Sequence, residues 1–202
     1  MNNQKNTIIE LQEQMKKIWN ILYISNLNSL IINNNLHYNK LLKNWINPNK
    51  EIKAELLYRL TRDGEQISKF HELCDNKGPT LTLFHTEDGN KGGLFTPLSW
   101  DKCSNWKNDM ETFIFNLNKN TKYEKINKEL SIMCNSDFGP WVPGLGFKII
   151  YQRRKKEIKS QMKKIHCYGD LNNYFKKGTN ILQNNSLEGT FNIKEVEVFK
   201  IM

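Results

Sequence analysis

The sequence lacks the features that mark a membrane-spanning or a secreted protein. Its apolar runs extend for only a few residues, far short of the ~20 that a membrane-spanning helix needs. The polar start, Met-Asn-Asn-Gln-Lys, is not followed by the apolar segment of a secretory signal. The cysteines are scattered, with no C-x-x-C pair, at Cys74, Cys103, Cys134 and Cys167. We therefore expect a cytoplasmic chain without a membrane span, whose thiols are reduced.

Signatures of catalysis are also missing. The sequence contains no P-loop, no G-x-G-x-x-G and no G-x-S-x-G motif. His71 and Cys74 lie close in sequence, but a zinc site needs about four ligands and no second pair accompanies them. Cys167 follows His166 and a basic run, yet it has no resolving cysteine at C-x-x-C spacing. The sequence therefore predicts no enzyme, no metal site and no cofactor.

Positive charge is what the chain has in excess. It carries 30 Lys and Arg against 21 Asp and Glu, a formal net charge of +9. The charge is densest over residues 152–164, where apolar residues at helical spacing predict a basic amphipathic helix. The segment opens with Arg153, Arg154, Lys155 and Lys156. Binding of nucleic acid or another acidic surface through residues 153–164 is therefore an alternative function, although no nucleic-acid motif accompanies the charge.

Residues 1–49 are predicted to form a helical prefix. Within a predicted helix over residues 7–32, apolar residues alternate at spacings of three and four, a heptad seam of just over two heptads. The seam residues are Ile8, Leu11, Met15, Ile18 and Leu22. A short coiled coil and a helix packed on its own domain are both open. Because Ser25 and Ser29 fall on the next seam positions, we expect weak or no association of the chain with itself.

A second helix is predicted over residues 36–46, ended by Asn47 and Pro48, since proline cannot continue a helix from its interior. After the prefix, residues 50–202 are predicted to form one domain that folds alone, with the first 35 residues dispensable. Leu56, Leu57 and Leu60 predict a helix that ends at Asp63 and Gly64, and residues 67–74 predict another.

The rest of the domain alternates short strands with glycine-containing turns. Strands are predicted over residues 80–86 and 93–96, paired as a hairpin, and over 113–117, 130–134, 147–151 and 190–201. The apolar pattern of the last strand changes phase at Lys194 and Glu195, so we expect a bulge there. Many short strands with few helices indicate an α+β, mainly β fold: a two-sheet antiparallel β-sandwich flanked by short helices.

Several segments of residues 52–202 resemble the TLDc domain family, in the order the family has them. The first is "LLYRLTRDG…FHELCDNKGPTLTL" from Leu56 to Leu83, and "GGLFT" with Trp100 follows. "FIFNL" at Phe113, the glycine-rich loop from Phe138, and the closing "LEGTFNIKEVEVF" complete the series. Each segment alone is weak, but five in sequence are specific. The Trp-Val-Pro insertion at residues 141–143 and the basic segment depart from the family's pattern.

The resemblance implies an interaction module rather than an enzyme. Proteins of this eukaryotic family are linked to protection from oxidative stress, and several bind the vacuolar proton-pumping ATPase (V-ATPase). Among the matched residues, Glu197 is the acidic one we single out for a partner contact. Trp100 and Trp141 are candidate anchors for a protein partner, because interface hot spots favour tryptophan. The residues matched for turns and helix ends are Arg62, Asp63, Gly64, Gly78, Pro79, Gly92, Gly93, Gly139, Pro140 and Gly189.

Overall fold

The computed structural model describes residues 2–124, 131–142, 147–150, 166–169 and 189–202. The helices in these residues are α1 (Asn2–Leu22), α2 (Leu36–Ile46), α3 (Leu60–Asp63) and α4 (Ile67–Cys74). The first six strands are β1 (Ile24–Ser25), β2 (Ile52–Arg59), β3 (Thr80–Thr86), β4 (Lys91–Thr96), β5 (Trp106–Lys107) and β6 (Phe113–Asn116). The others are β7 (Thr121–Glu124), β8 (Ile132–Met133), β9 (Trp141–Val142), β10 (Phe147–Ile150), β11 (His166–Gly169) and β12 (Gly189–Ile201).

One curled sheet organises the described strands, in the order β7-β6-β4-β3-β12-β11-β10-β9. Strand β2 also pairs with β12, and β1 pairs with β2 in the one parallel pairing among the named strands. Strands β5 and β8 form a separate two-stranded sheet. The α+β, mainly β class is therefore confirmed, and α2, α4 and the β3–β4 hairpin lie where the sequence predicts them.

The predicted division into two stacked sheets is not confirmed, because β12 joins both halves. At 13 residues it is long enough to pair with β11 through its first part and with β3 and β2 through the rest. Its register shifts between Ile193 and Glu195, which confirms the predicted bulge. Because a bulge bends its strand, β12 can serve both halves of one sheet.

Two predictions at the start of the chain are wrong. Residues 52–59 form strand β2, so the helix predicted there is reduced to the four residues of α3. The register of β2 shifts opposite Val198 and Phe199 and leaves Leu57 as an extra residue beside Leu56, which imitates helical spacing. The helix predicted over residues 7–32 ends at Leu22, because the next residues pair with β2.

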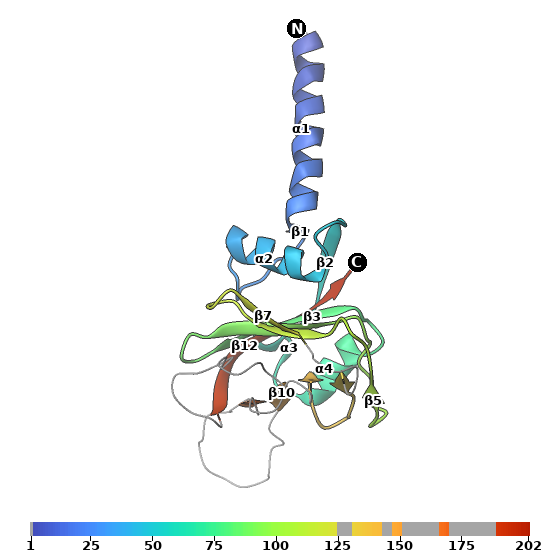
Figure 1. Cartoon of the computed structure of the whole chain (residues 1–202), viewed down its shortest axis with the longest axis vertical. Helices are drawn as coiled ribbons and strands as arrows, with labels where there is room; N and C mark the ends of the chain where they lie inside the picture. The colour runs from blue at the N-terminus through green and yellow to red at the C-terminus, as the bar shows by residue number, and fades with distance from the viewer. Residues whose placement is uncertain (1, 125–130, 143–146, 151–165, 170–188) are drawn as a thin grey trace.

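The sheet is buried on both faces. On one face, strands β2, β3, β4, β6 and β12 pack against the prefix, which contributes Ile24, Leu27, Ile31, Ile32 and Leu42. On the other face, the same strands pack against α4 and the segments that carry β5, β8 and β9, with Phe70, Trp100 and Ile132 in the core. Figure 1 shows α2 lying between the sheet and α1, whereas α1 projects away from the body.

Candidate interaction surfaces

The carboxylate of Glu197 lies in the interior, where β12, β2 and the prefix meet. One oxygen accepts hydrogen bonds from Arg59 Nε at 2.8 Å and from the Leu30 amide at 2.9 Å. The other accepts a hydrogen bond from the hydroxyl of Ser29. Arg59 also donates through Nη2 to the carbonyl of Asn28 at 2.7 Å. Because Glu197 is fully buried and bonded within the chain, its predicted role as a partner contact is corrected to an internal one.

A second carboxylate of β12 holds the adjacent turn. Glu195 accepts hydrogen bonds from the amide of Thr61 at 3.2 Å and from its hydroxyl at 2.5 Å. Asp63 accepts from the Arg59 amide at 2.8 Å and pairs with Arg62 at 2.8 Å. Burial opposes ionisation of Asp63, but the hydrogen bonds from Arg62 and Arg59 outweigh it and lower the pKa of that carboxyl.

The other matched residues also serve the fold. Gly64 ends α3 with a φ of +87°, which glycine adopts without strain. A Cβ on Gly93 would lie 2.0 Å from the Thr82 carbonyl oxygen, so only glycine fits there. Gly139 donates to the Ile149 carbonyl, and Pro140 accepts from the Ile149 amide. Of the remaining matched residues, Gly78 and Pro79 immediately precede β3, Gly92 lies within β4, and Gly189 begins β12.

Trp100 is a core residue. Its side chain is 1% exposed, and its indole nitrogen donates to the hydroxyl of Thr80 at 3.0 Å. Its ring also packs edge-on against Phe70, with centroids 6.3 Å apart. A tryptophan that is enclosed in this way does not present a surface to a partner, so the predicted anchor role of Trp100 is corrected.

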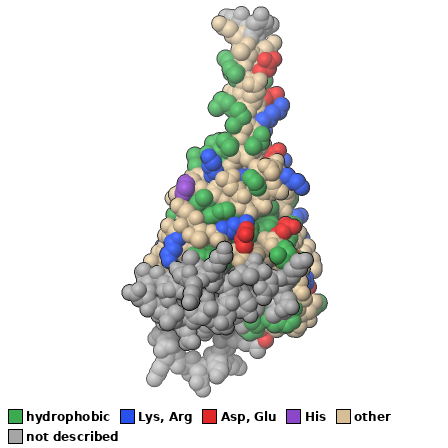
Figure 2. All heavy atoms as spheres, viewed as in Figure 1, with side chains coloured by type: hydrophobic (Ala, Val, Ile, Leu, Met, Phe, Trp, Pro, Cys, Tyr) green, Lys and Arg blue, Asp and Glu red, His purple; other side chains and the backbone are tan. Residues whose placement is uncertain are grey.

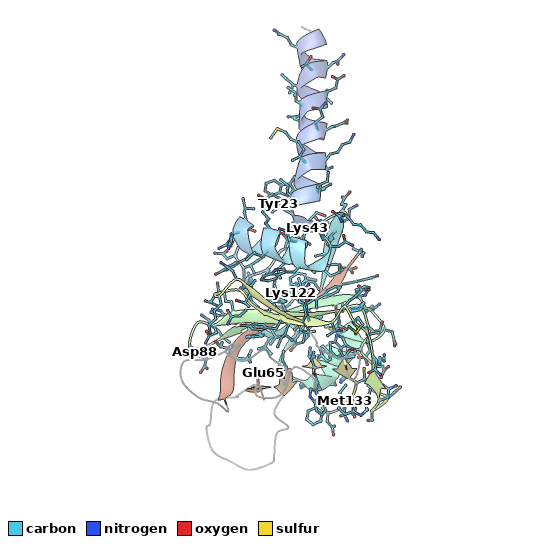
Figure 3. The ribbon with its side chains drawn as sticks, in the orientation of Figure 1. Tyr23, Lys43, Glu65, Asp88, Lys122 and Met133 are labelled. Atoms are coloured by element: carbon cyan, nitrogen blue, oxygen red, sulfur yellow. The ribbon has the colours of Figure 1, made fainter. Side chains whose placement is uncertain are left out.

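Trp141 belongs to an aromatic cluster that reaches the surface. We call Trp106, Phe138 and Trp141 the aromatic cluster. The Trp106 and Trp141 rings lie 5.9 Å apart between centroids, and the Phe138 and Trp141 rings 5.4 Å. Trp106 is 45% exposed, and the other two are partly buried. In β8, Met133 pairs with Trp106, and Figure 3 shows Met133 at the end of the body remote from α1.

A second apolar surface runs along α1. The seam side chains are all exposed, by 56%, 53%, 70%, 57% and 39% for Ile8, Leu11, Met15, Ile18 and Leu22. Figure 2 shows hydrophobic side chains along one side of this helix and charged ones along the other. The helix meets the body at its C-terminal end, where the Trp19 and Tyr23 rings lie 4.4 Å apart.

A shallow hollow of about 190 Å³ lies where the end of α2 meets β6 and β7. Lys122 on its wall donates to Glu124 at 2.7 Å and to the Trp45 carbonyl at 3.2 Å, and its ammonium lies 4.4 Å from the Phe113 ring centre. Figure 3 shows Lys122 beneath α2. The hollow is smaller than most small-molecule pockets, and its cation already has partners in the chain.

The described thiols and histidines do not assemble a reactive centre. Burial raises the pKa of Cys74 strongly and that of Cys134 to about 11, so both are neutral thiols at pH 7. Cys103 is exposed. His71 Nδ1 lies 2.9 Å from an Asp75 carboxylate oxygen, and its Nε2 has no partner within the described residues. In the same part of the chain, no three His, Cys, Asp or Glu side chains gather where they could hold a metal ion.

Some predicted features lie outside the described residues. Arg153, Arg154, Lys155 and Lys156 fall there, with the rest of the predicted basic helix. Cys167 lies on β11. Among the helices of the described residues, none combines the length and the hydropathy that a membrane span requires.

The chain belongs to the TLDc domain family, because the family's model matches residues 25–202. The resemblance of the sequence motifs is thereby confirmed. The match begins inside the prefix, so it includes Ser29 and α2 as well as the strands. A search of curated protein sequences finds no significant match to this chain.

Proposed function

We propose that this chain is a non-catalytic protein-interaction module of the TLDc type, and that the aromatic cluster is its contact surface. The exposed Trp106, packed at a tilt against Trp141, is the observation that carries the proposal. Tryptophan is enriched at interface hot spots because it buries a large area with few rotatable bonds. Of the two tryptophans singled out as anchors in the sequence, Trp141 is the one that lies at this surface.

The interactions of the buried carboxylates and the state of the buried thiols support a non-catalytic role. Glu195 and Glu197 are buried and accept hydrogen bonds from neighbouring parts of the fold, so these carboxylates hold structure together. The buried thiols of Cys74 and Cys134 are neutral at pH 7 because burial raises each pKa, which disfavours nucleophilic chemistry at either one.

Membership of the family suggests which partner to test first. The V-ATPase is bound by several TLDc proteins, and oxidative-stress protection is the role linked to the family. We propose both for this chain, in the cytoplasm, where scattered cysteines without a C-x-x-C pair stay reduced. The proposal separates into two parts: that a protein is bound through the aromatic cluster, and that the V-ATPase is that protein.

Binding of the full chain to purified V-ATPase, measured by biolayer interferometry, tests the proposal. Trp106→Ser should weaken binding by about tenfold or more, as hot-spot truncations do. Leu36→Ser is the matched control, since Leu36 is 47% exposed on α2, away from the cluster. We expect the control to bind like the unaltered chain, and both variants to melt normally.

The two parts fail in different ways. If the unaltered chain does not bind the V-ATPase, the choice of partner is refuted. If it binds and Trp106→Ser binds equally well, the aromatic cluster is not the contact surface.

Nucleic acid remains the second candidate because of the net charge of +9. Contacts with phosphates release counterions, so such binding falls steeply as salt is raised. Binding of a DNA duplex that weakens with salt and is lost on Arg153→Ala with Arg154→Ala would favour this candidate over the protein partner.

A further inference from the structure

Helix α1 is a long amphipathic helix without a covering surface. At 21 residues it spans ~32 Å, and the chain's own body leaves each seam residue at least 39% exposed. Helices in proteins owe most of their stability to packing of the apolar face, and an unpacked helix in water is marginal. A helix that projects from the body, as α1 does, would therefore be stabilised by another surface packed against its seam.

In the structure, the two serines that interrupt the seam in the sequence do not belong to the helix. Ser25 lies in β1, and Ser29 is buried beside Glu197, so neither serine is on the helix. Every seam position from Ile8 to Leu22 on α1 is then apolar, with spacings of three, four, three and four. This is the pattern of the a and d positions of a coiled coil.

The charges of α1 favour another helix over a lipid surface. Helix α1 carries Glu10 and Glu13 against Lys5, Lys16 and Lys17, so its net charge is only +1 (3 − 2 = 1). Helices that lie on membranes carry a polar face rich in Lys and Arg. A helix with a net charge of only +1 has little of the attraction to anionic lipid that such helices use.

The positions beside the seam favour an identical helix. In coiled coils, charges at the flanking positions select the partner, and like charges there keep identical chains apart. From residue 7 to residue 22, the flanking residues of α1 are uncharged: Thr7, Gln12, Gln14, Trp19 and Ile21. Nothing there opposes self-pairing, and Trp19 and Ile21 add apolar surface that is 47% and 56% exposed.

We propose that α1 pairs with α1 of a second copy of this chain, through the seam Ile8, Leu11, Met15, Ile18 and Leu22, as a short two-stranded coiled coil. The seam is only just over two heptads long, so the dimer is weak and its population depends on concentration. The exposed Trp106 of the aromatic cluster, at the other end of the body, remains accessible in this dimer, so this inference is compatible with the proposed function.

Sedimentation equilibrium of the full chain from about 5 µM to about 500 µM tests the proposal. The weight-average mass should rise with concentration toward that of a dimer. Leu11→Glu with Ile18→Glu should weaken dimerisation by at least about tenfold, because two like charges then face each other in each seam. Ile9→Glu is the matched control: Ile9 is an apolar residue, 47% exposed on the same helix, but it lies off the seam.

Disulfide trapping gives a second measurement, which can capture a dimer that is only sparsely populated. In a background of Cys103→Ser with Cys167→Ser, Met15→Cys should form a cross-linked dimer under mild oxidation, because seam residues face each other. Glu13→Cys, on the polar side, should stay monomeric. A mass that remains monomeric at every concentration, with no trapping at residue 15, would overturn the proposal. So would an Ile9→Glu variant that dissociates as readily as the seam variant.

Discussion

Glu197 joins three parts of the chain through one carboxylate. Its bonds reach Arg59 on β2 and both Ser29 and the Leu30 amide in the prefix. A buried carboxylate with this many donors is well compensated, but each donor then depends on it. The pair of Arg59 and Glu197 therefore matters to the fold far more than an exposed ion pair would.

We expect Glu197→Ala to lower the free energy of unfolding by about 3 kcal/mol, since it leaves Nε of the Arg59 guanidinium and the Leu30 amide without their acceptor. Urea denaturation followed by circular dichroism measures the change. Glu55→Ala is the control, because Glu55 is exposed on β2, and we expect it to stay within about 0.5 kcal/mol. Equal stabilities of the two variants would show that Glu197 does not hold these segments together.

At the scale of elements, the C-terminal end of α2 is stabilised by a buried lysine. Lys43 is buried, and its ammonium donates to the Asn47 carbonyl at 2.6 Å and to the Pro48 carbonyl at 3.2 Å. These carbonyls follow the last turn of the helix, where a cation also interacts favourably with the helix dipole. Burial lowers the pKa of Lys43, but the two acceptors give its charged form a place in the interior.

Lys43→Met should therefore destabilise the fold by about 1 to 3 kcal/mol, because two carbonyls lose their donor while the apolar stem is kept. Lys40→Met on the exposed side of the same helix should change stability little. Thermal melts of the two variants measure the difference. A Lys43→Met protein that melts with the control would indicate that water replaces the ammonium at no cost.

The sequence predicts well the elements whose apolar pattern has one period. Helix α4 and the β3–β4 hairpin follow from helical spacing, alternation and a turn of Asp88, Gly89 and Asn90. The sequence did not predict strand β2, because the bulge adds Leu57 as an extra residue after Leu56. This residue interrupts the alternation of apolar and polar side chains that marks a strand. The end of α1 was not predicted because the helical spacing was extended past Leu22 through Ser25 and Ser29, whereas in the structure the backbone of Ile24 bonds to the side chain of Asn39.

The candidate sites were predicted less well, because residue type does not specify burial. Tryptophan suits both a core and an interface, and only the tertiary structure separates Trp100 from Trp141. The alternation of β12 predicts that Glu197 lies on the polar side of the strand, but the prefix covers that side. Ser29, whose hydroxyl donates to the Glu197 carboxylate, is 168 residues away from it in sequence.

The whole molecule places its two apolar surfaces at opposite ends. Helix α1 projects from one end, and the strands that carry the aromatic cluster lie at the other (Figure 1). Between them, the sheet is enclosed by the prefix on one face and by α4 with its neighbours on the other. Because these surfaces lie apart, the proposed partner and the proposed second copy of the chain would not compete for the same surface.

This arrangement also bears on where the folding unit begins. The prediction that residues 50–202 fold alone, without the first 35 residues, rests on turn signals and matched motifs. In the structure, Ile24, Leu27, Ile31, Ile32 and Leu42 are buried against the sheet. Each buried side chain of this kind contributes about 1.5 to 3 kcal/mol, so the five contribute about 7 to 15 kcal/mol, an upper bound of the size of a whole domain's stability.

We therefore expect the two truncations to behave differently. A chain that starts at residue 24 lacks only the exposed α1, so its melting temperature should match that of the full chain. A chain that starts at residue 50 loses Ser29 and α2, which leaves Glu197 without two donors and exposes the apolar face around Leu81, Leu83 and Phe115. It should aggregate or melt without cooperativity in calorimetry. A cooperative melt of residues 50–202 near the temperature of the full chain would contradict this boundary and restore the one predicted at residue 49.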